Sequence, residues 1–196
     1  MNYILKSYHG FDLVPIESKL FMNRTIFIEG EIKSETACGF LREIMLLVSE
    51  DSERPINVLI NSLGGEINAG LLIYDTIQTC STPIKMFCVG KAYSMAAILV
   101  ACGNHGRYIF PNSELMLHEP IVESRINGNN SSIQSVAKSM LKIKSKINHI
   151  LAKHTKKDEN EIEEVTVYNH IFNAEESVKF GLVDEIIGFD KIVTEG

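Results

Sequence analysis

One serine in this sequence stands where an apolar strand pattern changes into a helix pattern. Ser94 follows the apolar run at 84–89 and precedes the small residues Ala96 and Ala97. A serine at such a corner exposes its hydroxyl above the sheet, and the next amide, that of Met95, then points to where a carbonyl oxygen would gain charge. The pattern predicts a nucleophile for acyl transfer. The alternative is a serine that only caps the following helix, which is common at such turns.

A glycine pair, Gly64-Gly65, lies at a second corner of the same kind, within Asn61–Glu66. Glycine adopts positive φ readily and lets the backbone come close to a ligand. Free amides at this corner are therefore candidates to bind an anion. A packing turn would need the same two glycines, so the pair becomes informative only together with Ser94.

A serine nucleophile needs a general base, and the sequence holds six histidines. His118 is the preferred candidate because it ends the apolar run Leu115–Leu117, just before a proline. Of the other five, His149 and His154 lie in a long helix pattern and His9 lies near the N-terminus. His105 and His170 are lesser candidates. A lone histidine at a strand end is more often structural, so this choice depends on Ser94.

The elements that must position these residues alternate between strand-like and helix-like patterns. Strands are predicted over 24–28, 56–61 and 84–89, and helices over 34–49, 66–79 and from 95 onward. Ser34 is the candidate N-cap of the first helix. Such alternation predicts right-handed crossovers around a largely parallel sheet, which is an α/β fold. Because no internal repeat or linker interrupts the pattern, one domain over 1–196 is expected.

A longer helix is predicted in the last third of the chain, over 131–154. Its apolar positions form one stripe: Ile133, Val136, Ala137, Met140, Leu141, Ile147, Ile150 and Leu151. A helix of about 24 residues would run roughly 36 Å, which is long for a domain of this size. We expect it to project or to pack against another subunit. The alternative is an ordinary helix that lies across the sheet.

The composition excludes several classes of protein. With 196 residues, 45% of them hydrophobic, the chain can bury one hydrophobic core without the help of disulfide bonds or metal ions. The 25 acidic residues outnumber the 19 basic ones and give a charge of −6, which argues against binding mainly to nucleic-acid phosphates or to an anionic membrane but leaves room for a local basic patch. The cysteines show no zinc-like spacing and are expected to be reduced core thiols: Cys38, Cys80, Cys88 and Cys102.

No targeting or membrane segment is expected. The longest apolar run, 95–102, is far below the roughly 20 residues that span a bilayer. The first twenty residues lack a basic stretch followed by an apolar one, so no secretory signal is predicted. A soluble, cytoplasmic protein is the resulting expectation.

Four motifs follow one another along the chain: Asn61–Gly65, Gly90–Ala97, Arg107–Ser113 leading to His118, and Phe180–Asp184. Together they resemble the ClpP family, the proteolytic subunit of ATP-dependent Clp protease, over about 18–187. The resemblance implies a crotonase-like α/β fold with a protruding long handle helix, in a handle region over 119–155. It further implies a homo-oligomer of two stacked heptameric rings, with active sites inside a closed chamber.

The resemblance also implies roles for individual residues. Ser94 matches the family nucleophile, His118 the general base, and the amides of Gly65 and Met95 the oxyanion hole. The position of the third triad member holds Asn169 instead of an aspartate. A neutral amide gives no charge to stabilise the imidazolium, and the same exchange in a serine protease lowers turnover about 10⁴-fold. Weak activity of the chain alone is therefore expected.

Other positions near the site differ from the family as well. Val167-Tyr168 replaces an Asp-Arg pair that couples the site to the opposite ring, and Ile121-Val122-Glu123 replaces a Gly-rich strand that aligns the substrate. Of the nearby acids, Asp184 belongs to an ordinary structural segment, and Glu119 is expected to face away from His118. These differences predict a specialised paralogue whose site is organised only in a particular assembly, such as a hetero-oligomer with a standard ClpP subunit.

The expected partners follow from the same resemblance. The chain has no phosphate-binding Gly-x-x-x-x-Gly-Lys-Ser/Thr loop, so it should not hydrolyse ATP and needs no cofactor or metal. A hexameric AAA+ ATPase is expected to feed it unfolded protein substrates. Residues 3–15, within an N-terminal segment over 1–17, match the axial pore loops that gate entry, and their mixed polarity fits a mobile element.

Two other functions remain open at this point. One is a structural ring subunit that completes a chamber and contributes little chemistry, which the neutral Asn169 favours. The other is an acyl-CoA hydratase or isomerase of the same broad fold, which would reuse the two-amide oxyanion hole. The sequence around Ser94 and His118 disfavours the second of these.

Overall fold

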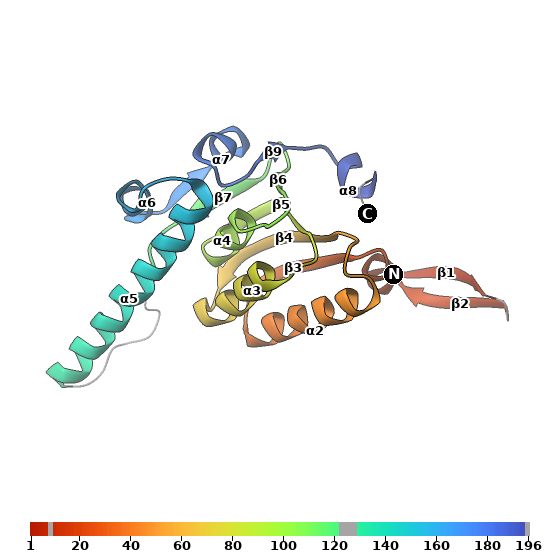
Figure 1. Cartoon of the computed structure of the whole chain (residues 1–196), viewed down its shortest axis with the longest axis horizontal. Coiled ribbons are helices and arrows are strands. Elements are labelled where there is room, and N and C mark those ends of the chain that lie inside the picture. Colours follow the sequence, from red (N-terminus) through yellow and green to blue (C-terminus); the bar gives the residue numbers. More distant parts are fainter. Residues whose placement is uncertain (8–9, 122–128, 195–196) are drawn as a thin grey trace.

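The computed structural model describes residues 1–7, 10–121 and 129–194, and its body is built around a largely parallel sheet (Figure 1). The strands of that sheet are β3 (Thr25–Ile32), β4 (Ile56–Gly65), β5 (Ile84–Tyr93), β6 (Arg107–Ile109), β7 (Glu114–Leu117), β8 (His170–Phe172) and β9 (Glu185–Ile186). They are ordered β3-β4-β5-β6-β9, and β7 pairs with both β5 and β8. Every pairing is parallel except that of β7 with β8, which confirms the predicted α/β class.

Helices connect the strands and cover the sheet. They are α1 (Ile16–Met22), α2 (Ser34–Glu50), α3 (Ile67–Thr79), α4 (Met95–Ala101), α5 (Asn130–Thr155), α6 (Glu159–Thr166), α7 (Ala174–Phe180) and α8 (Asp190–Thr194). The predicted starts are close, but β3, β4 and β5 each run four residues further than expected. The extensions of β4 and β5 carry the glycine corners beside the candidate site.

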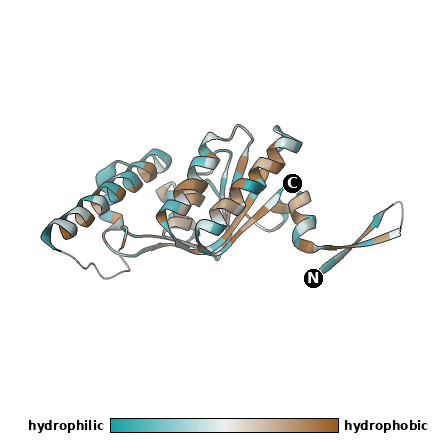
Figure 2. Ribbon diagram, turned by 90° about the horizontal axis from the view of Figure 1, so that it is seen from below, coloured by the Kyte–Doolittle hydropathy of each residue, from teal (hydrophilic) through white to brown (hydrophobic). Residues whose placement is uncertain are grey.

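The core follows from the alternation of side chains along the strands. Val58 and Ile60 of β4 are fully buried in the main cluster with apolar residues of α2, α3 and α4. Leu59, on the other face, packs with Phe87, Ile187 and Ile192 in a smaller cluster under α8. Figure 2 shows the hydrophobic residues along the strands and on the helices that cover them. Both faces of the sheet centre are therefore covered, as in other parallel sheets.

The start of α2 corrects one expectation. Ser34 is the first residue of the helix, and Lys33 takes the N-cap position with extended backbone angles of φ −120° and ψ 175°. The amide of Lys33 donates to Thr36 Oγ1 at 3.4 Å. Because the Thr36 hydroxyl turns back to the cap residue, the Ser34 hydroxyl is not needed as the cap.

Helix α5 confirms the long helix predicted from the apolar stripe and is 26 residues long. Its buried residues all lie in the C-terminal part, from Ile147 to Thr155. The N-terminal part extends away from the sheet (Figure 1), where Ile133 is 44% and Leu141 66% exposed. Within one chain, therefore, only the C-terminal part of the apolar stripe is buried.

The N-terminal segment is paired, although its mixed polarity fitted a mobile element. Strand β1 (Asn2–Ser7) pairs antiparallel with β2 (Gly10–Pro15), from Asn2 with Pro15 to Ser7 with Gly10. This hairpin extends from the end of the molecule opposite to α5 (Figure 1). Several of its apolar side chains are exposed, with Ile4 at 61%, Phe11 at 74% and Leu13 at 69%, whereas Leu5 and Val14 are half-buried.

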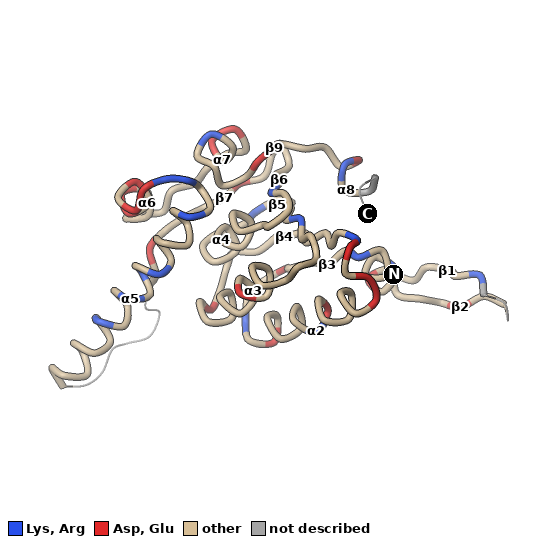
Figure 3. Tube along the Cα trace, viewed as in Figure 1, with Lys and Arg blue, Asp and Glu red and all other residues tan. Residues whose placement is uncertain are grey.

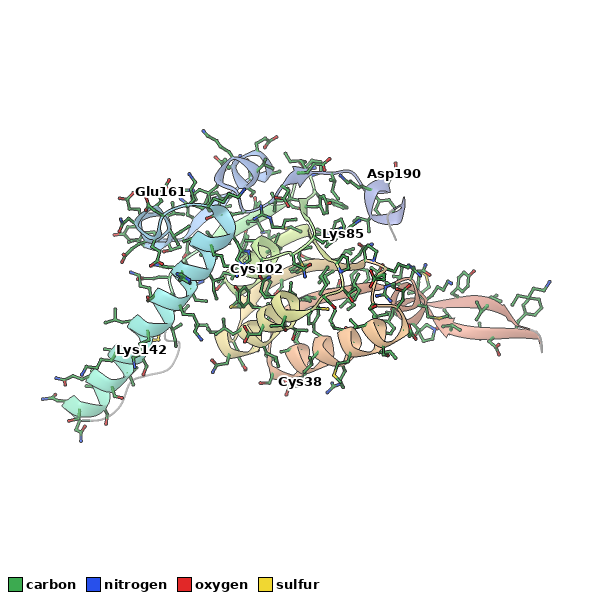
Figure 4. The ribbon with its side chains drawn as sticks, in the orientation of Figure 1. Cys38, Lys85, Cys102, Lys142, Glu161 and Asp190 are labelled. Atoms are coloured by element: carbon green, nitrogen blue, oxygen red, sulfur yellow. The ribbon has the colours of Figure 1, made fainter. Side chains whose placement is uncertain are left out.

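The four cysteines are free, but not all of them are core residues. Cys88 and Cys102 are buried, and burial raises the pKa of the Cys88 thiol to about 12. Cys80 is half-buried, whereas Cys38 is exposed on α2 (Figure 4). The expectation of a core thiol is wrong for Cys38 because its neighbour Ala37 takes the inward position. Within the described ranges, no helix is both long and apolar enough to cross a membrane.

Candidate active site

Ser94 lies at a strained corner between β5 and α4. Its backbone angles are φ 54° and ψ −125°, a region that residues other than glycine rarely adopt. The Ser94 amide donates to Met116 O at 2.8 Å, and the Ser94 carbonyl accepts from the amide of Ala97 at 3.0 Å. Ser94 occupies the N-cap position of α4, but its side chain makes no capping hydrogen bond, so the hydroxyl is not used to cap the helix. Strain of this kind persists where the surrounding structure enforces it, often at functional sites.

Replacing Ser94 by glycine is expected to stabilise the fold by about 1 kcal/mol, because glycine relieves the strained φ while losing some chain entropy. Urea unfolding at one fixed protein concentration would measure this. Ser94→Ala, which keeps a Cβ at the same φ, is the matched control and should show no gain. A glycine variant no more stable than the alanine variant would contradict the strain.

The glycine pair lies directly against this corner. Gly64 has φ 96°, and a Cβ on it would lie 2.7 Å from Tyr93 O and 2.9 Å from Ser94 Cβ. Gly65 has φ 154°, and a Cβ there would lie 2.2 Å from Ile32 O. Both positions therefore require glycine for close backbone approach as well as for conformation. The predicted neighbourhood of the glycine pair and Ser94 is present.

The two amides proposed for the oxyanion hole come from these same corners. Met95 is the first residue of α4, so its amide has no carbonyl partner within the helix. The Cβ position of Gly64 lies 3.2 Å from Met95 N, which shows how closely the glycine corner approaches the start of the helix. Gly65 is the last residue of β4, directly after Gly64. An anion placed at this corner would meet the start of α4 and its dipole.

Two polar side chains that precede the glycines hold their corner in place. Ser62 Oγ donates to Gly30 O at 2.5 Å and accepts from Gly64 N at 3.1 Å, and its side chain is buried. Asn61 Oδ1 accepts from Lys91 N at 3.3 Å, which ties the end of β4 to β5. Both residues belong to the Asn61–Gly65 motif, but the motif alone assigns them no role. The feature of the sequence that could have indicated this role is the position of both polar residues at the end of an apolar strand.

Strand register brings His118 and Asn169 to the Ser94 corner. Tyr93 pairs with Met116 across β5 and β7, so His118 lies two residues beyond this pair, just past the end of β7. Leu117 pairs with His170 in the antiparallel ladder of β7 and β8. One step past that pair, His118 follows the end of β7 and Asn169 precedes the start of β8, so the two residues lie opposite each other. The backbone therefore places the three predicted residues at adjoining strand ends.

Their side chains are not hydrogen-bonded to one another. Across the described ranges, no hydrogen bond links Ser94, His118 and Asn169, and Asn169 is exposed whereas His118 is half-buried. Catalytic hydrogen bonds are often long in unliganded enzymes and tighten with substrate. Residues 122 and 123, in the segment expected to align the substrate, lie outside the described residues.

The two acids considered as substitutes for the triad carboxylate, Asp184 and Glu119, are engaged elsewhere. The Asp184 carboxylate binds Arg107, with Nε 3.1 Å from Oδ2, and also accepts from the Arg107 amide at 2.9 Å. Glu119 Oε2 forms an ion pair with Lys144 Nζ at 3.0 Å. Asp184 is thus structural, as expected. Lys144 was not singled out from the sequence, because its partners are far from it along the chain.

The remaining histidines have other surroundings. His154 Nε2 lies 3.3 Å from the hydroxyl of Tyr74, and burial lowers the pKa of His154 to about 4. His149 pairs with Glu159 at 2.9 Å. His105 and His170 are exposed, and His9 lies outside the described residues. Among the described histidines, His118 is the one that follows β7 beside the Ser94 corner.

Comparison with known families agrees with this geometry. A family model described as Clp protease matches residues 9–190, a span that contains both glycine-bearing corners and the ends of β7 and β8. The mainly parallel sheet with its covering helices is consistent with the ClpP fold. By this match, the chain belongs to the Clp protease family.

Proposed function

We propose that this chain is a serine endopeptidase subunit of an ATP-dependent Clp protease chamber that degrades unfolded polypeptides. The observation that carries the proposal is Ser94, held at φ 54° without a capping bond and packed against Gly64. A strained serine at a strand-to-helix corner, next to the first amide of the following helix, is an arrangement suited to acyl transfer. Membership of the Clp protease family supports the same chemistry.

The proposed roles follow from the chemistry of peptide cleavage. Ser94 Oγ attacks the peptide carbonyl carbon while His118 takes its proton, and the amides of Gly65 and Met95 stabilise the oxyanion that forms. His118 then gives the proton to the leaving amine, which leaves an acyl ester on Ser94. Water, activated by His118, hydrolyses that ester and frees the serine. No cofactor is needed for these steps.

Asn169 is proposed to fill the third triad position and to keep the activity of the chain low. Its amide can accept one hydrogen bond from the imidazole but adds no negative charge. The imidazolium formed during attack is therefore less stabilised than beside a carboxylate.

The assembly is proposed to be two stacked heptameric rings, alone or mixed with a standard ClpP subunit. The exposed apolar positions Ile133 and Leu141 on the projecting part of α5 support a handle at the contact between rings. The exposed apolar hairpin β1-β2 supports a gate that meets a hexameric AAA+ ATPase, which would use the ATP. With a charge of −6 per chain, neither nucleic acid nor an anionic membrane is proposed as a partner. The cytoplasm is the proposed location.

A second candidate is a structural ring subunit with little chemistry of its own. The specific observation that favours it is Asn169, since the nearby carboxylates of Asp184 and Glu119 are bound to Arg107 and Lys144. In this case the chain would complete a chamber whose activity comes from a second ClpP paralogue.

Labelling with a fluorophosphonate separates the two candidates. We expect the probe to label the wild-type chain slowly and to label it faster when it is mixed with a standard ClpP subunit. Ser94→Ala should remove the labelling of this chain, because the probe forms its bond with an activated serine.

The matched control is Ser49→Ala, which removes an exposed hydroxyl on α2 and should label like the wild type. Absence of Ser94-dependent labelling, both alone and in the mixed assembly, would overturn the endopeptidase proposal in favour of the structural subunit.

A further inference from the structure

Lys144 on α5 joins two acidic side chains from separate elements. Its Nζ lies 2.7 Å from Glu163 Oε1 on α6 and 3.0 Å from Glu119 Oε2, in the segment after β7. The Lys144 side chain is 23% exposed, and its hydrogen bonds to Glu163 and Glu119 raise its pKa. The three residues form a network that connects the long helix, the short helix and the chain beside His118.

Glu119 is the residue directly after His118, and it is held at two points. Its amide donates to Thr166 O at 2.7 Å, at the C-terminal end of α6. Its carboxylate binds Lys144. Thr166 is itself buried, and its hydroxyl donates to Ile162 O at 2.9 Å. The position of the His118 backbone therefore depends on where α5 and α6 lie.

The same helix end also precedes Asn169. Helix α6 ends at Thr166, three residues before Asn169, which register places next to His118. A displacement of α6 would therefore move both partners of the proposed imidazole contact. Lys144 binds α6 through Glu163, so it influences the position of Asn169 as well as that of His118.

Charge on the two helices is strictly divided. Helix α5 carries lysines but no acidic residue, and α6 carries glutamates but no lysine or arginine, as Figure 3 shows. Without Lys144, the carboxylates of Glu119 and Glu163 would face each other near α5 with no cation between them. Repulsion would then separate the segment of Glu119 from α6, in the direction that displaces His118.

We propose that Lys144 is a positioning residue for the proposed peptidase reaction: by binding Glu119 and Glu163 together, it fixes His118 relative to Ser94 and couples the catalytic segment to helix α5. The inference rests on the proposed function. A general base must lie within hydrogen-bond reach of the proton it takes, and a misplacement of about 1 Å can cost about 10²-fold in rate. An isolated exposed ion pair would matter little, but this network acts through geometry.

The test compares hydrolysis of a short fluorogenic peptide by the whole oligomer. Lys144→Met is expected to lower kcat about tenfold with KM changed less than about twofold, because the base is displaced while the substrate cleft is kept. Lys144→Arg should keep kcat within about twofold of the wild type, because it restores the cation between the two acids. Equal kcat for Lys144→Met and wild type would overturn the inference.

The matched control is His149→Gln, which breaks another contact of α5 with α6, the 2.9 Å pair of His149 with Glu159, without touching Glu119. It should leave kcat unchanged. If it lowered kcat as much as Lys144→Met does, general loosening of the helices would replace positioning as the explanation. Glu119→Gln combined with Lys144→Met should be no slower than Lys144→Met alone, since both act through one contact. Additive losses would contradict the network.

Hydrogen exchange gives a readout that does not depend on activity. The Glu119 amide, bound to Thr166 O, should exchange about tenfold faster in Lys144→Met and at the wild-type rate in His149→Gln. Unchanged exchange at Glu119 would overturn the inference even with an active enzyme. Conversely, faster exchange in a chain that shows no Ser94-dependent turnover would refute the proposed function but leave the coupling of Lys144 to the His118 segment standing.

Discussion

Replacing Asn169 by aspartate is expected to raise the peptidase kcat of this chain by about 10²–10⁴-fold, with KM nearly unchanged. Register places residue 169 next to His118, one step beyond the pair of Leu117 with His170. A carboxylate there would hold the imidazole in the tautomer that accepts the serine proton and would stabilise the imidazolium that follows. In the proposed mechanism residue 169 acts on His118 and not on the substrate, so the effect should fall on kcat.

The matched control for this substitution is Asn173→Asp. Asn173 is four residues further along, and its side chain caps α7 by accepting from Glu176 N at 2.9 Å. Aspartate caps as well as asparagine does, so the control adds the same charge to the same region without reaching His118. It should leave kcat unchanged. The measurement is the initial rate of fluorogenic peptide hydrolysis at saturating substrate, in assemblies of equal size.

A second control removes the nucleophile from the improved chain. Asn169→Asp combined with Ser94→Ala should return the rate to background, because the carboxylate acts only through the serine and histidine. If Asn169→Asp alone gave no increase while Ser94 still reacted with fluorophosphonate, residue 169 would not be the triad position. The neutral residue would then not be what limits the activity.

Local patterns were sufficient for the elements that carry Ser94 and the glycine pair. The apolar runs at 56–61 and 84–89 and the glycines after them predicted strands that end at corners, and β4 and β5 are found there. The strands run on to Gly65 and Tyr93 because they pair with their neighbours beyond the apolar runs. That pairing is a tertiary effect, which a local pattern does not contain.

The contact of the His118 and Asn169 segments could not be predicted from local patterns alone. Strand β8 has only three residues, and its pairing with β7 joins segments more than fifty positions apart. A run this short gives no periodicity, so Asn169 was identified only through a family resemblance. Lys144 was missed for a related reason, since a lysine on a helix is usually solvated and its two acidic partners come from other elements.

A different residue, Arg107, is expected to have the largest effect on stability. Its side chain is 14% exposed and joins four parts of the chain. Nη1 donates to Ala101 O at 3.2 Å, His154 O at 3.0 Å and Gly181 O at 2.8 Å, while Nε binds Asp184. These carbonyls lie at the ends of α4, α5 and α7, where the last carbonyls of a helix have no partner within it. One guanidinium therefore caps three helices.

Arg107→Met is expected to lower the free energy of unfolding by about 3 kcal/mol, because it leaves these carbonyls without their side-chain donor and removes the cation that pairs with the Asp184 carboxylate. Asp184→Asn should cost less, about 1 kcal/mol, because an amide oxygen still accepts from Arg107 and residue 184 is half exposed. Urea unfolding at fixed protein concentration measures both, and the m-value should stay constant.

Arg54→Met is the matched control, since Arg54 is exposed on the loop after α2 and its loss should change the free energy of unfolding by less than about 0.5 kcal/mol. A loss below about 1 kcal/mol for Arg107→Met would contradict the capping role, because a single unsatisfied buried carbonyl already costs that much. The ordering of the three variants also bears on the site. If Asp184→Asn lowered stability but left peptide hydrolysis unchanged, Asp184 would be confirmed as a structural partner of Arg107 and excluded as a substitute for the missing triad acid.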